Sequence, residues 1–231
     1  MPTGRAAADP VTAPGTGLIP QQRGEQLLDC AVRYADERHW DVFPGTWLRI
    51  TDGMEHCSCG AASCAAPGAH PARPDWADQA TGSAAAVRLA WGRQPRASIL
   101  LPTGRTFDAL DVPESAGFLA LARMERMGIT LGPVTCTPDR RMVFFVLPGT
   151  AARVPGLVRT LGWAPDSIDL TAHGEGHYIA APPTRIGSRG AVQWVRRPTV
   201  ANRWQPDAEE LLSPLAYACG QEAPVGRSRH I

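Results

Sequence analysis

The sequence predicts an α+β fold in which helices flank a mixed β-sheet, and two observations lead to this class. Segments with the apolar period of helices alternate irregularly with short runs rich in Val, Ile and Phe, which are typical of strands. The chain of 231 residues is 44% hydrophobic, enough for the core of one domain. We therefore expect one domain over residues 23–220, between a disordered tail at 1–22 and a second tail at 221–231.

The elements of the first half follow from apolar spacing and turn residues. Residues 25–38 carry one apolar stripe and predict a helix, which is followed by a short strand at 41–44 that ends in proline. Residues 52–82 show no period and predict a long loop. Ser83 is expected to cap a helix that runs to residue 91. Buried strands are predicted at 98–101 and 107–112.

The second half continues the alternation of helices and strands. A helix over 113–127 is expected to end at Gly128, because glycine readily adopts the left-handed backbone of a C-terminal cap. Strands are predicted at 134–137 and 142–147, and a helix at 154–161. Residues 168–171 and 178–181 are expected to form a hairpin, in which His173 and His177 flank a glycine turn and are solvated or line a site. A strand at 192–195 and a helix at 207–219 complete the domain.

Composition excludes several classes of protein. The net charge is +1, and all 23 basic residues are arginine, which we interpret as a coding bias. No apolar run approaches the roughly 18 residues of a membrane span, and the start lacks the apolar stretch of a signal peptide. Three of the six cysteines fall within eight positions, unlike the pattern of a secreted disulfide scaffold. We therefore expect a cytoplasmic protein with one metal clip and no membrane partner.

Four residues of metal-ligating types lie within fourteen positions of the sequence: Cys57, Cys59, Cys64 and His70. Zinc prefers four soft or borderline ligands in a tetrahedron, and the glycines and prolines in this segment let the chain fold back between them. Because the protein would supply all four ligands, we expect a structural zinc site in an insertion over residues 55–74. The alternative is a surface loop whose cysteines hold no metal.

Asp108 and Asp111 both lie on the predicted strand at 107–112. Nucleotidyl transfer by two metal ions needs carboxylates that converge on one face. Side chains alternate along a strand, so two residues three positions apart point to opposite faces. Pro113 shares the face of Asp111, and Glu114 follows at the turn, from where its carboxylate could reach the same place. In the alternative interpretation, Asp108 caps a helix or lies at a solvated edge.

Several segments occur in the order found in the bifunctional primase/polymerase N-terminal domains of bacteria and their plasmids, which the sequence resembles. They are residues 40–44, 57–60, 67–71, 98–104, 110–112, 137–145, 168–170 and 176–184. The resemblance covers roughly residues 25–185. It implies a primase–polymerase (RRM-like) fold with a zinc-stem insertion. It also implies nucleotidyl transfer on a DNA template, with nucleoside triphosphates as substrates.

The resemblance carries roles over to Asp111, Asp169 and Arg141, and the enzyme hypothesis adds Glu114 and Arg140. Asp111 and Asp169 match metal-ligating positions of the family, and we expect them to meet on one face of the sheet as catalytic residues. Glu114 would complete the group, which would hold Mg²⁺ or Mn²⁺ in an active enzyme. Arg140 and Arg141 are expected to contact the phosphates of the nucleotide.

Two departures from the family pattern argue against full activity. The family's second catalytic aspartate falls on Pro113, and its nucleotide-binding histidine falls on Met142, which we expect beside the two aspartates. The activity is therefore expected to be weak or lost. The alternative is a non-catalytic regulatory module that binds nucleic acid or protein. Because the sequence contains no helicase region, primase work would need a helicase or another replication protein in trans.

The segment between residues 175 and 207 contains no acidic residue. Arginines bind phosphates and aromatic rings stack on bases, so the segment is a candidate nucleic-acid interface. The candidate contacts are Arg185, Arg189, Arg196 and Arg197, with Trp194 and Trp204 interleaved. The alternative places the tryptophans in the core and the arginines on a solvated face.

Overall fold

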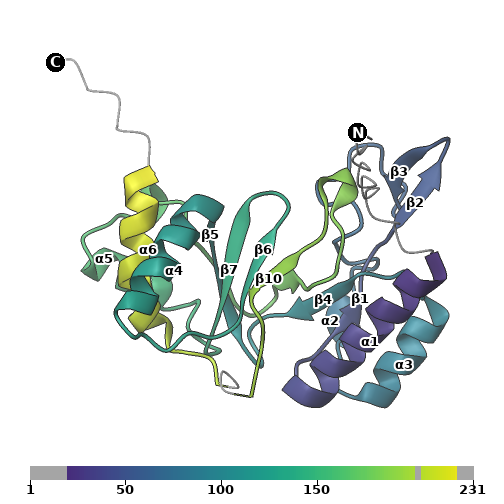
Figure 1. Ribbon diagram of the computed structural model, residues 1–231, viewed down its shortest axis with the longest axis horizontal. Helices are drawn as coiled ribbons and strands as arrows, with labels where there is room; N and C mark the ends of the chain where they lie inside the picture. The colour runs from purple at the N-terminus through teal and green to yellow at the C-terminus, as the bar shows by residue number, and fades with distance from the viewer. Residues whose placement is uncertain (1–19, 201–203, 223–231) are drawn as a thin grey trace, which may run out of the picture.

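The computed structural model describes residues 20–200 and 204–222, and a five-stranded antiparallel sheet stands between two groups of helices (Figure 1). The strands follow the order β10 (Gln193–Arg196), β6 (Val134–Thr137), β7 (Arg141–Val146), β5 (Asp108–Pro113) and β8 (Thr171–His173). A second antiparallel sheet contains β1 (Phe43–Pro44), β4 (Ile99–Pro102) and β9 (Tyr178–Ala180). A separate hairpin pairs β2 (Leu48–Thr51) with β3 (Met54–Cys57).

The helices lie in two groups on either side of the sheets. On one side are α4 (Glu114–Arg126), α5 (Val154–Thr160) and α6 (Ala208–Glu222), and on the other are α1 (Pro20–Arg38) and α3 (Ala84–Arg93). The short helix α2 (Trp76–Gln79) packs near β1, and single 3-10 turns occur at Pro165–Ser167 and Gly187–Arg189. The α+β class is confirmed, with its strands divided between separate sheets.

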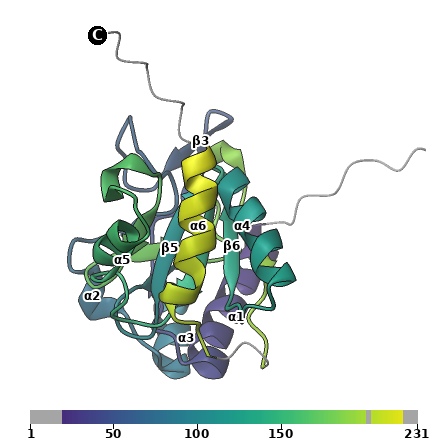
Figure 2. The same ribbon diagram turned by 90° about the vertical axis from the view of Figure 1, so that its left-hand side faces the viewer.

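Helices α4 and α6 cover one face of the five-stranded sheet (Figure 2). The even-numbered side chains of β5 and β7, among them Leu110 and Met142, are buried beneath them. Gly117 of α4 permits the close approach, because a Cβ atom there would lie 2.6 Å from the Met142 Sδ atom. The first core is therefore a helix layer on a sheet.

The opposite face of the sheet builds a second core with α1, α3 and the three-stranded sheet. Aromatic rings fill it: Trp40 stacks on Phe145 at 5.2 Å between ring centroids, and Phe107 stacks on Phe145 at 4.6 Å. Trp194 joins this group and donates its Nε1 hydrogen to the Tyr34 hydroxyl at 3.2 Å. Trp194 is therefore partly buried and packs against the second core, which is close to the alternative that placed the tryptophans in the core.

The hairpin predicted from residues 168–171 and 178–181 is wrong. Strand β8 pairs with β5 in the large sheet, whereas β9 pairs with β4 in the small one, so the intervening chain crosses between sheets. Thr103 holds this crossing, since its Oγ1 donates to the Gly174 carbonyl oxygen at 2.6 Å and its N–H to the His177 carbonyl oxygen at 3.0 Å. Apolar alternation marks each strand but does not identify its partner.

The segment 52–82, predicted to be one long loop, contains more structure. Asp52 and Gly53 both have positive φ, 52° and 75°, as a two-residue type I′ hairpin turn requires. They join β2 to β3. The Asp-Gly dipeptide is a strong hairpin signal, which the sequence analysis missed.

The ends of the domain lie close to the limits of the described residues. The predicted tails at 1–22 and 221–231 fall largely outside that range, while α1 begins at Pro20 and α6 ends at Glu222. Within the described part of the chain, no helix combines the length and apolar character that crossing a bilayer requires.

We expect Gly104→Ala to destabilise the domain by about 3 kcal/mol or more. Gly104 has φ of +97°, and a Cβ atom there would lie 2.4 Å from the backbone Cα of Glu175. Gly149→Ala is the matched control, because Gly149 has φ of +79° but nothing within 4 Å, so only backbone strain of about 1–2 kcal/mol is expected. Urea denaturation measures both, and equal losses would contradict the close approach of the two segments.

Candidate active site and cysteine cluster

Asp111 and Asp169 meet through one arginine. The Arg141 Nε atom donates to Asp111 Oδ1 at 2.7 Å, and the Arg141 Nη1 atom donates to Asp169 Oδ2 at 2.7 Å. A third bond, 3.3 Å long, runs from Arg141 Nη2 to the backbone carbonyl oxygen of Asp111. The two aspartates therefore lie together, as expected, but a guanidinium group lies between their carboxylates.

The pairing of β5 with β7 determines which side chains reach this place. Pro113 lies opposite Arg141 and Asp111 opposite Val143, so these four side chains share one face of the sheet. Met142 points to the other face and is fully buried under α4. The expectation that Met142 lies beside the aspartates is wrong, because strand alternation places Arg141 in the site.

His173 also contacts the aspartate pair. It lies on β8 opposite Ala109 of β5, and its Nε2 atom is 3.3 Å from Asp111 Oδ2. Its side chain is 21% exposed, so of the two alternatives for His173, a solvated residue or one that lines a site, the structure has the second. The contact arises because β8 pairs with β5 at the edge of the sheet, and nothing in the sequence near His173 predicts that pairing.

The two aspartates of the site share a single guanidinium. Burial by itself would lower the pKa of Arg141, but the hydrogen bonds to Asp169 and Asp111 outweigh it and the pKa is raised. Arg141 is thus a permanent cation that serves two carboxylates. A pair of divalent ions needs several free carboxylate oxygens. The residues present do not fit such a pair, since the two aspartates already share one guanidinium and no third carboxylate of residues 20–200 or 204–222 joins them.

The other acidic candidates lie elsewhere. Glu114 was expected to complete the group, but its Oε2 is 3.2 Å from Arg140 Nε and its Oε1 accepts from the Cys136 thiol at 3.2 Å. Asp108 is 1% exposed and accepts the backbone N–H of Ala151 at 2.7 Å. Neither residue supplies the missing carboxylate, and Arg140 pairs with Glu114 at the surface.

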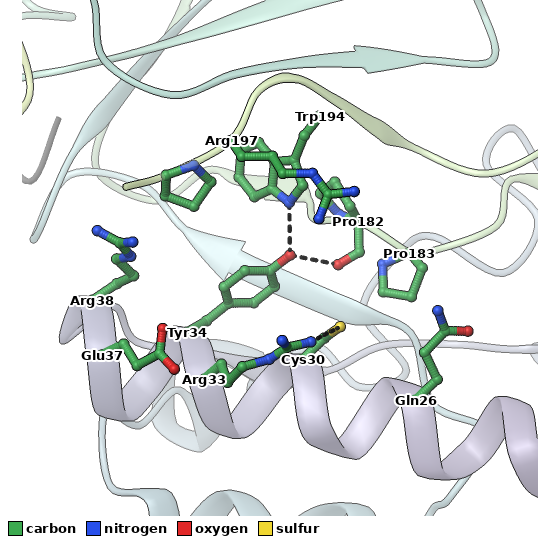
Figure 3. A pocket seen from close by; sticks show the side chains of 11 residues that line it. Gln26, Cys30, Arg33, Tyr34, Glu37, Arg38, Pro182, Pro183, Trp194 and Arg197 are labelled. Atoms are coloured by element: carbon green, nitrogen blue, oxygen red, sulfur yellow. Dashed lines mark hydrogen bonds between the residues drawn. The ribbon is translucent and has the colours of Figure 1, made fainter. Parts of the chain in front are cut away.

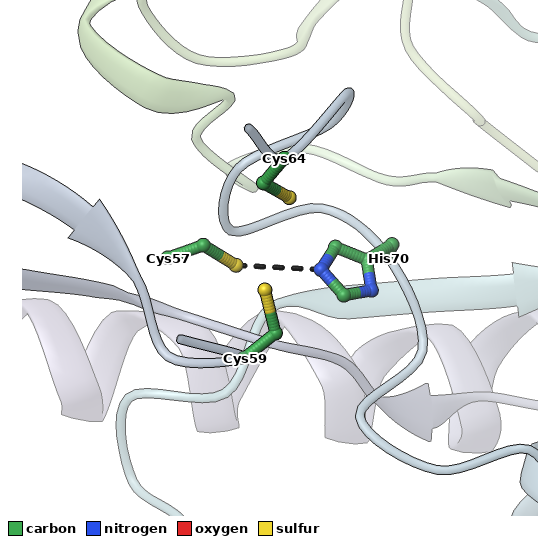
Figure 4. Close-up of side chains that lie close together, drawn as sticks. All are labelled: Cys57, Cys59, Cys64 and His70. Carbon is green, nitrogen blue, oxygen red and sulfur yellow. Dashed lines mark hydrogen bonds between the residues drawn. The ribbon is translucent and has the colours of Figure 1, made fainter. Parts of the chain in front are cut away.

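The structure brings together the four residues of the predicted metal clip (Figure 4). One ligand atom from each of Cys57, Cys59, Cys64 and His70 lies within 4.8 Å of the others. Ligands of a tetrahedral metal–thiolate centre lie roughly 4 Å apart, so the four atoms fit one ion after small adjustments. The cluster is therefore a candidate metal site with four protein ligands.

The tautomer of His70 and the pKa of Cys57 both favour binding of a cation by this cluster. The His70 Nδ1 atom lies 2.8 Å from the Pro71 carbonyl oxygen, which can only accept, so Nδ1 carries the hydrogen and Nε2 presents its lone pair to the thiols. Burial raises the pKa of Cys57, but backbone N–H groups of Cys59 and Gly68 lower it more, to about 6. Cys57 is thus available as a thiolate, the form that binds metals.

The predicted nucleic-acid contacts do not form one patch. Arg185 pairs with Glu55 at 3.2 Å, and Arg196 pairs with Glu125 at 3.0 Å. Arg189 lies at the surface. Of the two tryptophans, Trp194 is partly buried against the second core, and the other is 79% exposed.

Arg197 lies over a groove against helix α1 (Figure 3). The groove has a volume of about 260 Å³. Two further arginines, Arg33 and Arg38, line it from α1, with Glu37 the only acidic residue among its lining. Because cations outnumber anions there, the groove is the most suitable described surface for a phosphate backbone.

Most of the chain matches the sequence model of one known protein family. The sequence model of the family described as bifunctional DNA primase/polymerase, N-terminal, matches residues 31–206. Among solved structures, the chain is similar to the polymerase domain from Mycobacterium tuberculosis ligase D in complex with DNA. The sequence identity is 14%, the TM-score is 0.38, and the alignment covers 91% of this chain and 99% of that one. No curated protein matches the sequence.

We expect Arg141→Ala to destabilise the domain by about 2–4 kcal/mol, because it leaves the largely buried Asp111 carboxylate without its cation. Asp169→Ala removes the other half of the bridge, but Asp169 is 60% exposed and the cost should be only about 0.5–1 kcal/mol. Chemical denaturation at neutral pH compares the two variants. A cost for Arg141→Ala no larger than that for Asp169→Ala would show that the bridge does not stabilise the fold.

Proposed function

The chain belongs to the bifunctional DNA primase/polymerase N-terminal family, and from this we propose that it binds DNA but has lost most or all nucleotidyl transfer. The observation that carries the proposal is the Arg141 bridge between Asp111 and Asp169. A guanidinium group with two short ion pairs holds the carboxylates that metal ions would need. Pro113 stands where the family pattern places a further carboxylate.

The size of the expected loss follows from the chemistry of the reaction. Phosphoryl transfer depends on positioning and on charge stabilisation by metal ions, and the protein supplies little else. A missing carboxylate at Pro113 and an aspartate pair already bound to Arg141 each remove about 3 kcal/mol or more of transition-state stabilisation. Together they would slow the reaction on the order of 10⁴-fold if the effects add.

Retained DNA binding is supported by family membership and by the groove above α1 (Figure 3). Arg33, Arg38 and Arg197 give it a positive charge, and Arg189 adds an exposed cation elsewhere on the surface. Arg185 and Arg196, which the sequence analysis also assigned to DNA, are paired with glutamates and are weaker candidates. Nucleoside triphosphates and a helicase or replication protein acting in trans stay predictions.

We expect the purified protein to give no primer extension or de novo priming with Mg²⁺ or Mn²⁺, while an active family member extends the same primer. The same preparation should bind single-stranded DNA in a fluorescence anisotropy assay. Binding should survive Asp111→Ala and weaken about tenfold in the double variant Arg33→Ala plus Arg197→Ala.

Either half of this proposal can fail by itself. Robust metal-dependent synthesis that Asp111→Ala abolishes would show that the aspartates act despite Arg141. Absence of DNA binding at low salt would contradict the proposal that the protein binds DNA. Unchanged binding in the double arginine variant would contradict the assignment of that binding to the groove. Arg88→Ala plus Arg93→Ala, two exposed arginines of α3 outside the groove, is the control.

The cysteine cluster supports a second proposal, that the ion it holds is Zn²⁺ in a structural role. Three thiols and one imidazole are ligands that zinc prefers, and four protein ligands leave no position for water. The ion would tie the end of β3 to the loop that carries Cys64 and His70.

Freshly purified protein should contain about one equivalent of zinc by mass spectrometry, because the four ligands form one site. Cys64→Ser should lose the metal and melt at a lower temperature, since the loop loses its tether. Cys30→Ser is the matched control, because Cys30 lies on α1 outside the cluster and should keep both metal and melting temperature. Wild-type protein without metal would contradict the proposal.

A further inference from the structure

A pocket of about 460 Å³ lies beside the β2–β3 hairpin, away from the aspartate pair. Helix α1, the hairpin and the chain at 183–191 form its walls. Its volume is in the range of sites for small organic ligands. The apolar part of its lining comes from Leu27, Trp47, Leu48 and Ile50.

Buried polar atoms without partners concentrate in the residues of this pocket. Among the described residues, eight buried side-chain nitrogen or oxygen atoms have no hydrogen-bond partner. Three of the eight belong to residues that line the pocket: Trp47 Nε1, Ser98 Oγ and Arg185 Nε. Because native proteins satisfy nearly all such atoms, a partner is missing at the wall of this pocket.

The unpartnered atoms specify what that partner carries. The Trp47 indole nitrogen and the Arg185 Nε atom can only donate, so the ligand must accept. Arg96 adds an exposed guanidinium, which lies 5.9 Å from the centre of the Trp47 ring. The one acidic residue in the lining, Glu55, is already paired with Arg185 at 3.2 Å. An oxyanion has the complementary charge and only acceptor atoms.

We propose that this pocket binds a small amphipathic carboxylate, with its oxyanion head near Trp47, Arg96 and Arg185 and its apolar body against Leu27 and Leu48. The proposal goes beyond the function proposed above, since it uses none of the residues assigned to DNA in the groove or to the aspartate site. A nucleotide also carries an oxyanion, but a polar sugar and base would not match the apolar wall.

The test uses the full-length protein and the fluorescent anion anilinonaphthalene sulfonate, which has an aromatic body and an oxyanion head. We expect it to bind with one saturable site and to be displaced by decanoate. Decanol, with the same chain and no charge, should displace it at least about tenfold less well, because a charged head forms the stronger hydrogen bonds.

Variants locate the binding site on the protein. Arg96→Ala should weaken decanoate binding about tenfold, and Trp47→Phe, which keeps a ring but removes the indole donor, about fivefold. Arg93→Ala is the matched control, because Arg93 is an exposed arginine three residues before Arg96 and lies outside the pocket. Circular dichroism and melting curves establish that each variant is folded.

Three outcomes would overturn the proposal. Decanol that competes as well as decanoate would show that no oxyanion is recognised. Displacement by deoxyadenosine monophosphate and not by decanoate would show that the body is not apolar. Equal binding in Arg96→Ala, Trp47→Phe and Arg93→Ala, all folded, would place the dye elsewhere.

Discussion

The antiparallel pairing of β5 with β7 is the constraint on which the rest of the molecule depends. Six residue pairs join the two strands, and their alternation sends one set of side chains under α4 and α6 and the other toward α1 and α3. Two cores therefore share one sheet. Asp111, Pro113 and Arg141 lie on the same face of the sheet as the second core, at the end of these two strands. The site is thus a product of the same register that builds the cores.

That register places the positively charged guanidinium group of Arg141 in the site. Arg141 is held by two carboxylates and one backbone carbonyl, so its guanidinium is fixed in position before any ligand arrives. In an active nucleotidyl transferase, metal ions would neutralise such carboxylates and also bind the phosphates. A guanidinium binds both carboxylates through its N–H groups but cannot bridge them to substrate phosphates as a metal ion does. The Arg141 bridge is therefore the basis for proposing that nucleotidyl transfer is lost.

Close contacts also join the β2–β3 hairpin to the loop at Gly68. Leu48 of β2 lies opposite Cys57 of β3, and Gly68 approaches Leu48 so closely that a Cβ atom would lie 2.9 Å from its Cγ. The Gly68 N–H also donates to the Cys57 thiol at 3.3 Å. The cysteine cluster and the wall of the pocket are therefore built from the same few residues. A metal ion at the cluster would stabilise that wall as well as the loop.

The sequence by itself determined the segments and the local chemistry of this protein. The patterns of residues 25–38 and 107–112, the cap at Ser83 and the spacing of the cysteines all rest on interactions within a few residues. The structure has the cap and the cysteine cluster as predicted, a helix that begins earlier, at Pro20, and a strand shifted by one residue, at Asp108–Pro113. Only the tertiary structure decided that β8 and β9 join different sheets, that Arg141 rather than Met142 faces the aspartates, and that Glu114 turns away. The physical reason is that the pairing partner of a strand depends on distant segments, and a shift of one residue moves every side chain to the other face.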